Sequence, residues 1–290
     1  MPEIITTLSN LATLIFVISS MLALGLSLTL AQILHPLKDV NLVVRSLAAN
    51  FVLVPLIAFG LKSVMGLDPS LGVGLILLAT AAGAPFLPKL AQVAKADVAF
   101  SVGLLVLLMV VTVIYIPIVL PLLLPGVSVN PVEIGRSLVV LMLIPLAIGL
   151  GVKARYEDVA ASWQPHMAQA ASISLVAVFV LMLGLNFQTM LGAIGSGAIM
   201  AAILFIGLSL VVGYGLGPAS ATRPVLGLGT AQRNIAAAMV VATGNFSDDP
   251  NVLTMILVGA LLMLVILMPI AGEVGKRAPA SDPSSQPTVD

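Results

Sequence analysis

The chain has 290 residues, of which 60% are hydrophobic and 8% are charged, and its formal net charge is zero. Soluble globular proteins carry about 25% charged residues, so this composition, with a mean hydropathy of +1.18, predicts a membrane protein instead. The balanced charge gives no electrostatic basis for binding nucleic acid. The lack of cysteine excludes thiol chemistry, disulfides and thiolate metal sites.

Long apolar stretches divide the chain into units of membrane-spanning length, each about 20 residues or more. The nine units cover residues 8–34, 41–62, 70–95, 97–124, 133–154, 166–188, 194–216, 222–246 and 250–272. They predict an all-α polytopic membrane protein with nine transmembrane units. The start of the chain lacks the basic region of a signal peptide, so we expect the first unit to remain as a helix. Residues 1–274 are expected to form one carrier domain, followed by a disordered cytoplasmic tail at 275–290.

Lysine and arginine are distributed unevenly between alternate connections. With nine crossings and the N-terminus outside, the cytoplasmic segments carry Lys38, Arg45, Lys95, Lys153, Arg155, Arg223, Lys276 and Arg277. The outer segments carry Lys62 and Arg136. Because cytoplasmic loops are enriched in these residues, we expect the N-terminus outside, the C-terminus in the cytoplasm, and a bacterial inner membrane as the host membrane.

Two units contain residues that oppose a continuous helix. The candidate breaks are Gly83, Pro85 and Pro88 in the third unit, and Gly227 and Gly229 in the eighth. Proline removes a backbone donor and glycine loosens the turn. We therefore expect each unit to form two half-helices joined by irregular backbone. Such backbone is tolerated in a membrane where protein buries it or a wet cavity adjoins it.

The two interrupted units have similar surroundings. Lys89 lies six residues after Gly83, and Arg233 lies six residues after Gly227. Each cation is followed by a helix of small residues and then by a long apolar helix. Matched interruptions of this kind indicate a secondary transporter built from inverted repeats. We expect units one to four to repeat as units six to nine, with the two broken helices crossing.

Crossed broken helices bring half-helix ends to the middle of the membrane, where N-termini favour anions and C-termini favour cations. Arginine also binds carboxylate, sulfonate or phosphate in a bidentate manner. We therefore expect a site for a small organic anion. Its candidate residues are Arg233 and Lys89 for charge, and Gln232, Asn234 and Thr230 for hydrogen bonds. Two alternatives stay open: Arg233 satisfying carbonyls freed by the other break, and Lys89 reaching the membrane interface.

Other polar residues have simpler interpretations. Asp97 is expected to cap the helix that follows it, and Asn50 is expected to join helices rather than bind a ligand. The sequence contains no His/Glu/Asp metal cluster, catalytic triad or phosphate-binding loop. We therefore expect neither an enzyme nor a metal site, and paired broken helices with a basic centre fit a carrier better than an ion channel.

Three segments resemble the bile acid:sodium symporter family. They are GTAQRNIAAAMVVA (229–242), KLAQVAKADVAFSVGLLVLLMVV (89–111) and ALGLSLTLAQIL (23–34), and the resemblance extends over about 10–272. It implies a core domain, here 70–124 and 194–272, with crossed broken helices. It also implies a panel domain, here 8–62 and 133–188, that moves against the core in alternating access. Members of the family transport organic anions such as bile acids, pyruvate and pantoate together with sodium.

The positions that the resemblance assigns to sodium ligands are mostly changed. They fall on Leu87, Pro88, Leu105, Gly227 and Ala231, whose side chains have no oxygen, and on Ser101, which keeps one. Hard cations prefer oxygen ligands. We therefore expect no cofactor to be required and Ser101 to be at most a weak ion ligand. A sodium ion held by backbone carbonyls stays open as an alternative. Fixed positive charge from Lys89 and Arg233 is expected to replace the sodium ion.

Together these features predict a secondary transporter that moves a small organic anion across a lipid bilayer. One alternative is an efflux carrier of a related inverted-repeat family, which the direction of flux in vesicles would distinguish. A second alternative is a membrane sensor that kept the fold without transport, which would show no flux.

Overall fold

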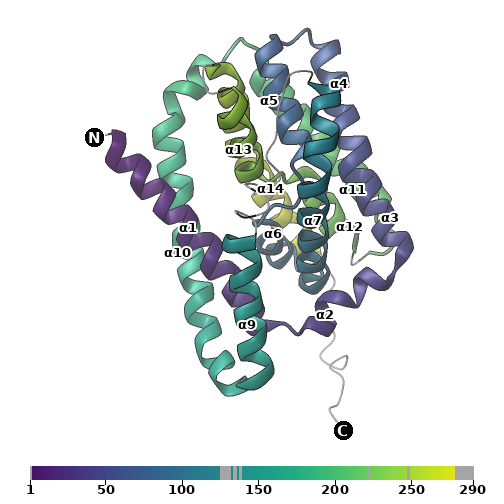
Figure 1. Ribbon diagram of the computed structural model, residues 1–290, viewed down its shortest axis with the longest axis vertical. Helices are drawn as coiled ribbons and strands as arrows, with labels where there is room; N and C mark the ends of the chain where they lie inside the picture. Colours follow the sequence, from purple (N-terminus) through teal and green to yellow (C-terminus); the bar gives the residue numbers. More distant parts are fainter. Residues whose placement is uncertain are drawn as a thin grey trace.

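A computed structural model describes residues 2–124, 132, 136, 139–220, 222–246 and 249–277 (Figure 1). Within these residues all regular secondary structure is helical. The elements are α1 (Pro2–Ser27), α2 (Leu30–Leu34), η1 (Pro36–Lys38), α3 (Val40–Ala48), η2 (Ala49–Leu53), α4 (Val54–Val64), α5 (Pro69–Thr80), α6 (Leu87–Val93), α7 (Val98–Leu123), η3 (Val139–Leu143), α9 (Ile144–Arg155), α10 (Glu157–Gly192), α11 (Ala198–Leu216), α12 (Thr222–Ala231), α13 (Ile235–Asn245) and α14 (Pro250–Arg277). The expected all-α class is confirmed.

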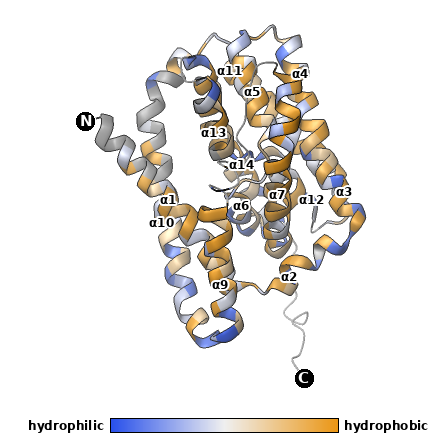
Figure 2. Cartoon of the chain, in the orientation of Figure 1, coloured by the Kyte–Doolittle hydropathy of each residue, from blue (hydrophilic) through white to orange (hydrophobic). Residues whose placement is uncertain are grey.

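Four helical stretches of the described chain are long and apolar enough to cross a membrane. They are Val40–Val64, Val98–Leu123, Ala198–Leu216 and Pro250–Arg277. Two shorter apolar helices, Leu11–Ser27 and Pro69–Thr80, accompany them. Apolar residues cover most of these helices, as Figure 2 shows. The expected number of nine transmembrane units stays a prediction.

The helices pack in two groups, which lie on the left and right of Figure 1. The helices α1, α9 and α10 pack against one another, and we call them the α1–α9–α10 group. On the other side, α11 packs against α12, α14 and α4, while α5 packs against α4 and α14. The stretch Val40–Val64 therefore packs with α5 and α11 rather than with the helices of the expected panel. The core and panel boundaries that the family resemblance implies stay a prediction.

The two interrupted helices occur as expected and lie across each other. The first interruption separates α5 from α6, and the second separates α12 from α13. The half-helix α13 packs against α5, α12 packs against α6, and α14 contacts all four. In Figure 1, α5 and α13 lie in the upper half and α6 and α12 in the lower half. We call the place where residues 78–84 meet residues 230–234 the crossing.

The residues expected to cause the breaks are placed differently in the two helices. Gly83, at φ +80°, and Pro85 lie in the first break, while Pro88 is the second residue of α6, where proline is tolerated. Gly227 and Gly229 lie inside α12, so the expectation that they break the eighth unit is wrong. They serve close packing instead: a Cβ at Gly229 would lie 2.9 Å from a methyl group of Leu87. The second break comes later, at residues 232–234.

The structure also tests the predicted start of α7 and the predicted end of the last helix. Asp97 caps α7, since its Oδ1 accepts a hydrogen bond from the backbone N–H of Phe100 at 2.8 Å, as predicted. The helix α14 continues to Arg277, so the first residues of the expected tail, 275–277, are helical. The remainder of that tail, 278–290, lies outside the described residues. Of the fifth unit, residues 136 and 139–154 are described.

Candidate functional site

The first break interrupts the regular hydrogen bonds of a helix at its backbone carbonyls. Donors from other parts of the chain bind these carbonyls instead. Five carbonyl oxygens there accept hydrogen bonds from outside the α5–α6 segment, those of Leu78, Ala79, Ala81, Ala82 and Gly83. Four of the donors come from Arg233 and Asn234, and the fifth is the hydroxyl of Thr112. A buried, unpaired carbonyl is costly, so these residues stabilise the irregular backbone of the first break.

Arg233 is completely buried, with 0% of its surface exposed. Its Nε donates to the carbonyl of Leu78 at 3.1 Å, and its Nη2 donates to the carbonyl of Ala79 at 2.6 Å. Its Nη1 donates to Oδ1 of Asn50 at 2.8 Å and to the carbonyl of Thr230 at 3.2 Å. Four of the five N–H groups of the guanidinium therefore bind protein oxygens. This geometry favours the alternative in which Arg233 satisfies carbonyls of the other break.

Asn234 also joins the two breaks. Its backbone N–H donates to the carbonyl of Ala81 at 2.8 Å, and its Nδ2 donates to the carbonyl of Gly83 at 2.9 Å. Its Oδ1 accepts from the N–H of Ala237 at 3.1 Å, which makes Asn234 the N-cap of α13. A single buried side chain thus caps one half-helix and holds the other break in place.

Asn50 and Thr230 complete the polar network of the crossing. Asn50 lies in the π-helical turn η2 and is fully buried. Its Nδ2 donates to the carbonyl of Ser46 at 3.0 Å and to Oγ1 of Thr230 at 3.3 Å. The prediction that Asn50 joins helices is confirmed, since its amide connects α3 and η2 to α12 and to Arg233.

Gln232 is 6% exposed and lies at the start of the second break. Its backbone N–H donates to the carbonyl of Leu228, which continues the turn of α12. Its Oε1 is buried and accepts no hydrogen bond from the described residues. A buried acceptor without a donor costs roughly 1–3 kcal/mol, so this amide is an acceptor that a bound donor group would satisfy.

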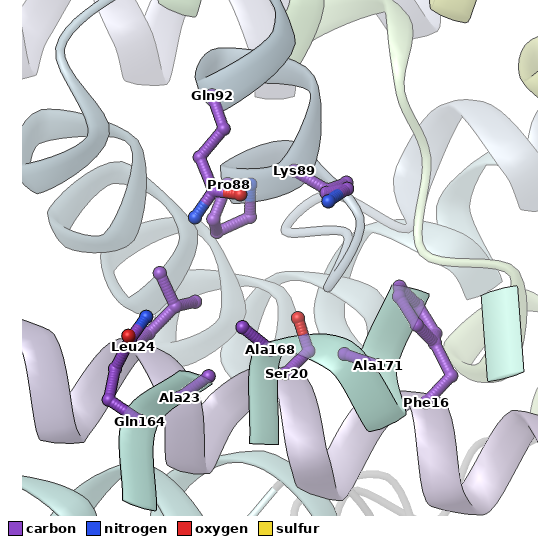
Figure 3. Close-up of a pocket in the computed structure, with 10 residues that line it drawn as sticks. All are labelled: Phe16, Ser20, Ala23, Leu24, Pro88, Lys89, Gln92, Gln164, Ala168 and Ala171. Carbon is purple, nitrogen blue, oxygen red and sulfur yellow. The ribbon is translucent and has the colours of Figure 1, made fainter. Parts of the chain in front are cut away.

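Lys89 lies away from this network, in a pocket between α6 and the α1–α9–α10 group (Figure 3). The pocket encloses about 390 Å³, including the part open to its surroundings. Its lining residues are Phe16, Ser20, Ala23 and Leu24 of α1, Pro88, Lys89 and Gln92 of α6, and Gln164, Ala168 and Ala171 of α10. The Nζ of Lys89 donates to Oγ of Ser172 on α10 at 3.2 Å. Among the described residues no carboxylate forms an ion pair with Lys89.

The family model for the sodium bile acid symporter family matches residues 14–194. The match covers more than half of the 290 residues, and it includes every residue that lines the pocket. The chain belongs to the sodium bile acid symporter family. Since the members of this family are transporters, the family points to transport across a membrane rather than to catalysis. The crossing extends beyond the match, because Thr230, Arg233 and Asn234 follow residue 194.

A curated plant protein is similar in sequence to this symporter family member. The chain is similar to a protein of Arabidopsis thaliana named probable sodium/metabolite cotransporter BASS3, chloroplastic, with 27% identity over 196 residues. The aligned part is 67% of this chain and 45% of that relative. The chain therefore spans less than half of the length of the relative that it matches.

The predicted site residues of this family member fall into two places. The structure brings Thr230, Arg233 and Asn234 together at the crossing, with Gln232 beside them, and it places Lys89 in the pocket. Ser101 is fully buried in α7, and its Oγ donates to the carbonyl of Val98 at 2.6 Å. That bond leaves its oxygen able to accept, so the weak ion-ligand role of Ser101 stays a prediction.

Several residues of both places were not recognised as site residues from the sequence. At the crossing Thr112 was missed, and around the pocket Ser20, Gln92, Gln164 and Ser172 were missed. Isolated polar residues within apolar segments are the signal that could have found them. That signal does not say which of them face one another, because they lie on four different helices, α1, α6, α7 and α10.

Proposed function

We propose that this protein is a secondary carrier for a small organic anion, which binds in the pocket between α1, α6 and α10. The observation that carries the proposal is the placement of Lys89. Its ammonium group has three donors, one of which binds Ser172, in a pocket where no described carboxylate neutralises its charge. An anionic group of a ligand supplies the missing partner at low cost.

The lining of the pocket suits an anion with an apolar body. Phe16, Leu24 and the alanines of α1 and α10 form apolar walls. In Figure 3 the amides of Gln92 and Gln164 point toward each other across the pocket, and the Ser20 hydroxyl points into it. The space between these side chains is small, about 390 Å³ even when the part open to the surroundings is included. The combination favours a carboxylate or sulfonate of modest size over a bulky ligand.

We propose alternating access as the mechanism, with the α1–α9–α10 group moving against the remaining helices. Two observations support it. The pocket lies between the two groups, so a relative movement would open it to one side and then the other. Each broken helix is also followed by one long helix, α7 or α14, as expected for inverted repeats around a central site.

The name of the plant relative adds a substrate class to this proposal. That protein is described as a sodium/metabolite cotransporter, which is consistent with a metabolite-sized anion here. The proposed substrate is therefore a small carboxylic or sulfonic acid.

Ligand-induced stabilisation of the purified protein in detergent tests the proposal directly. We would measure the melting temperature, Tm, with benzoate and butyrate, and with benzamide and butyramide as uncharged controls of the same shape. A ligand at a hundredfold excess over its Kd stabilises the folded state by about 2.7 kcal/mol. We expect at least one anion to raise Tm by about 5 °C while its amide has no effect. Uptake into proteoliposomes would follow with the stabilising anion.

Each outcome of these measurements has a distinct meaning. Stabilisation by an anion together with uptake supports the carrier. Outward flux alone, under gradients of either direction, would indicate an efflux carrier instead. Binding without flux would indicate the non-transporting sensor, and equal shifts with anions and amides would contradict a role for charge in recognition.

We also propose nine crossings in a bacterial inner membrane, with the N-terminus outside and the C-terminus in the cytoplasm. The uneven distribution of Lys and Arg supports this orientation. The structure brings two of the basic segments to one end, since Gly275 near Lys276 packs against Val93 near Lys95.

Cysteine labelling checks this orientation without a background, because the chain contains no cysteine. Ser63→Cys and Arg277→Cys lie at exposed positions of α4 and α14. A membrane-impermeant maleimide is expected to label Ser63→Cys in intact cells and Arg277→Cys in inverted vesicles. Labelling of both in intact cells would contradict the proposed odd number of crossings.

A further inference from the structure

The crossing gathers the carbonyl ends of two half-helices around one point. Leu78 and Ala79 belong to the last turn of α5, and Thr230 belongs to the last turn of α12. Unpaired carbonyls at a helix C-terminus carry partial negative charge and favour a cation. In transporters with broken helices, such ends are where a coupling cation is bound. The backbone at this crossing therefore forms a cation-binding environment.

That environment is occupied by a side chain of the protein itself. The guanidinium of Arg233 is surrounded by four oxygens, those of Leu78, Ala79 and Thr230 and the amide oxygen of Asn50, at 2.6–3.2 Å. Among the described residues no aspartate or glutamate forms an ion pair with it. The partial charges of the two helix ends are thus what compensates the positive charge of Arg233.

A separate cation at the same point would have to compete for the same oxygens. The carbonyls of Leu78, Ala79 and Thr230 already accept N–H groups from a guanidinium that is fully buried and cannot move into water. Oε1 of Gln232 is an unpaired acceptor nearby in sequence, but one oxygen does not make the shell that a hard cation needs. The residues present do not fit a sodium ion at this place.

We propose that Arg233 is a built-in cation that takes the place of a coupling sodium ion at the crossing. The core then assembles in its binding-competent form without sodium. The consequence for coupling rests on the carrier function proposed above, whereas the consequence for folding stability does not. A test that uses no organic anion therefore gives a result that is independent of the proposed substrate.

The test is the Tm of the purified full-length chain in sodium chloride and in choline chloride at equal ionic strength. Three variants accompany the wild type. Arg233→Gln removes the charge, and Arg233→Lys keeps it with fewer donors. Arg223→Gln is the matched control, because Arg223 lies on the same half-helix, is exposed, and donates to the carbonyl of Gly217.

We expect the wild type, Arg233→Lys and Arg223→Gln each to melt at the same temperature in both salts. Arg233→Gln is expected to lose about 10 °C in choline chloride, because two helix ends lose their donor. Sodium should restore about 5 °C in that variant alone, since the vacated carbonyls become available to a small cation. Arg223→Gln should lose little in either salt.

Three results would overturn the proposal. The first is a wild-type Tm that rises in sodium chloride relative to choline chloride. The second is an Arg233→Gln protein as stable as Arg223→Gln. The third is an Arg233→Gln protein that is destabilised equally in both salts, because Arg233 would then be a structural cross-link and not a substitute for an ion. If Arg233→Gln does not fold, the wild type and Arg233→Lys still test the proposal. A higher Tm in sodium chloride than in choline chloride for either protein would overturn it.

Discussion

Replacing Asn234 with alanine is expected to lower the stability of the folded protein by about 3 kcal/mol. The variant loses the N-cap of α13, worth about 1 kcal/mol, and leaves the carbonyl of Gly83 buried and unpaired, at roughly 1–3 kcal/mol. Asn234 is fully buried, so water cannot replace either bond without a cavity. Tm should fall by about 10 °C, which thermal unfolding in detergent measures.

A second variant separates the two roles of the Asn234 side chain, and a control variant accompanies it. Asn234→Ser keeps an oxygen that caps α13, but it is too short to replace the amide donor to Gly83, so an intermediate Tm is expected. Asn251→Ala is the matched control, because Asn251 is exposed at the start of α14. Equal stability of Asn234→Ala and Asn251→Ala would show that the contact between the breaks contributes nothing.

Replacing Lys89 with glutamine is expected to weaken the binding of the organic anion by about 10- to 100-fold. Hydrogen bonds to charged groups contribute roughly 1.5–3 kcal/mol, and each 1.4 kcal/mol is a factor of ten in Kd. The stability of the ligand-free protein should hardly change, since Lys89 is half-buried and donates to one hydroxyl group, that of Ser172. Titration with the stabilising anion, followed by Tm or by calorimetry, gives the Kd.

The choice of controls makes this result specific to the pocket. Lys89→Arg keeps the charge and is expected to retain most of the affinity, although a guanidinium is larger than an ammonium group. Lys276→Gln removes the same charge from an exposed position at the end of α14, and should bind as the wild type does. An unchanged Kd in Lys89→Gln would place the anion elsewhere in the molecule.

The two breaks differ in how accurately the sequence predicts their positions. The first break was located from Gly83 and Pro85, because their backbone restrictions act locally wherever the chain lies. The second was placed too early, at Gly227 and Gly229, although both are helical in the structure. Glycine weakens a helix by only about 1 kcal/mol, and tight packing against neighbours such as Leu87 outweighs that cost.

The sequence by itself determined the properties that depend on composition and on local backbone chemistry. These are the all-helical membrane class, the two interrupted helices, the capping role of Asp97, and the need of Arg233 for partners within the membrane. Only the tertiary structure shows which groups accept the hydrogen bonds of Arg233. The carbonyls of Leu78 and Ala79 lie about 150 residues earlier in the chain, and nothing in a carbonyl group marks it in the sequence. It likewise decided that Lys89 faces α10 and that Val40–Val64 packs against α5 and α11, because helix packing depends on shapes that apolar periodicity does not encode.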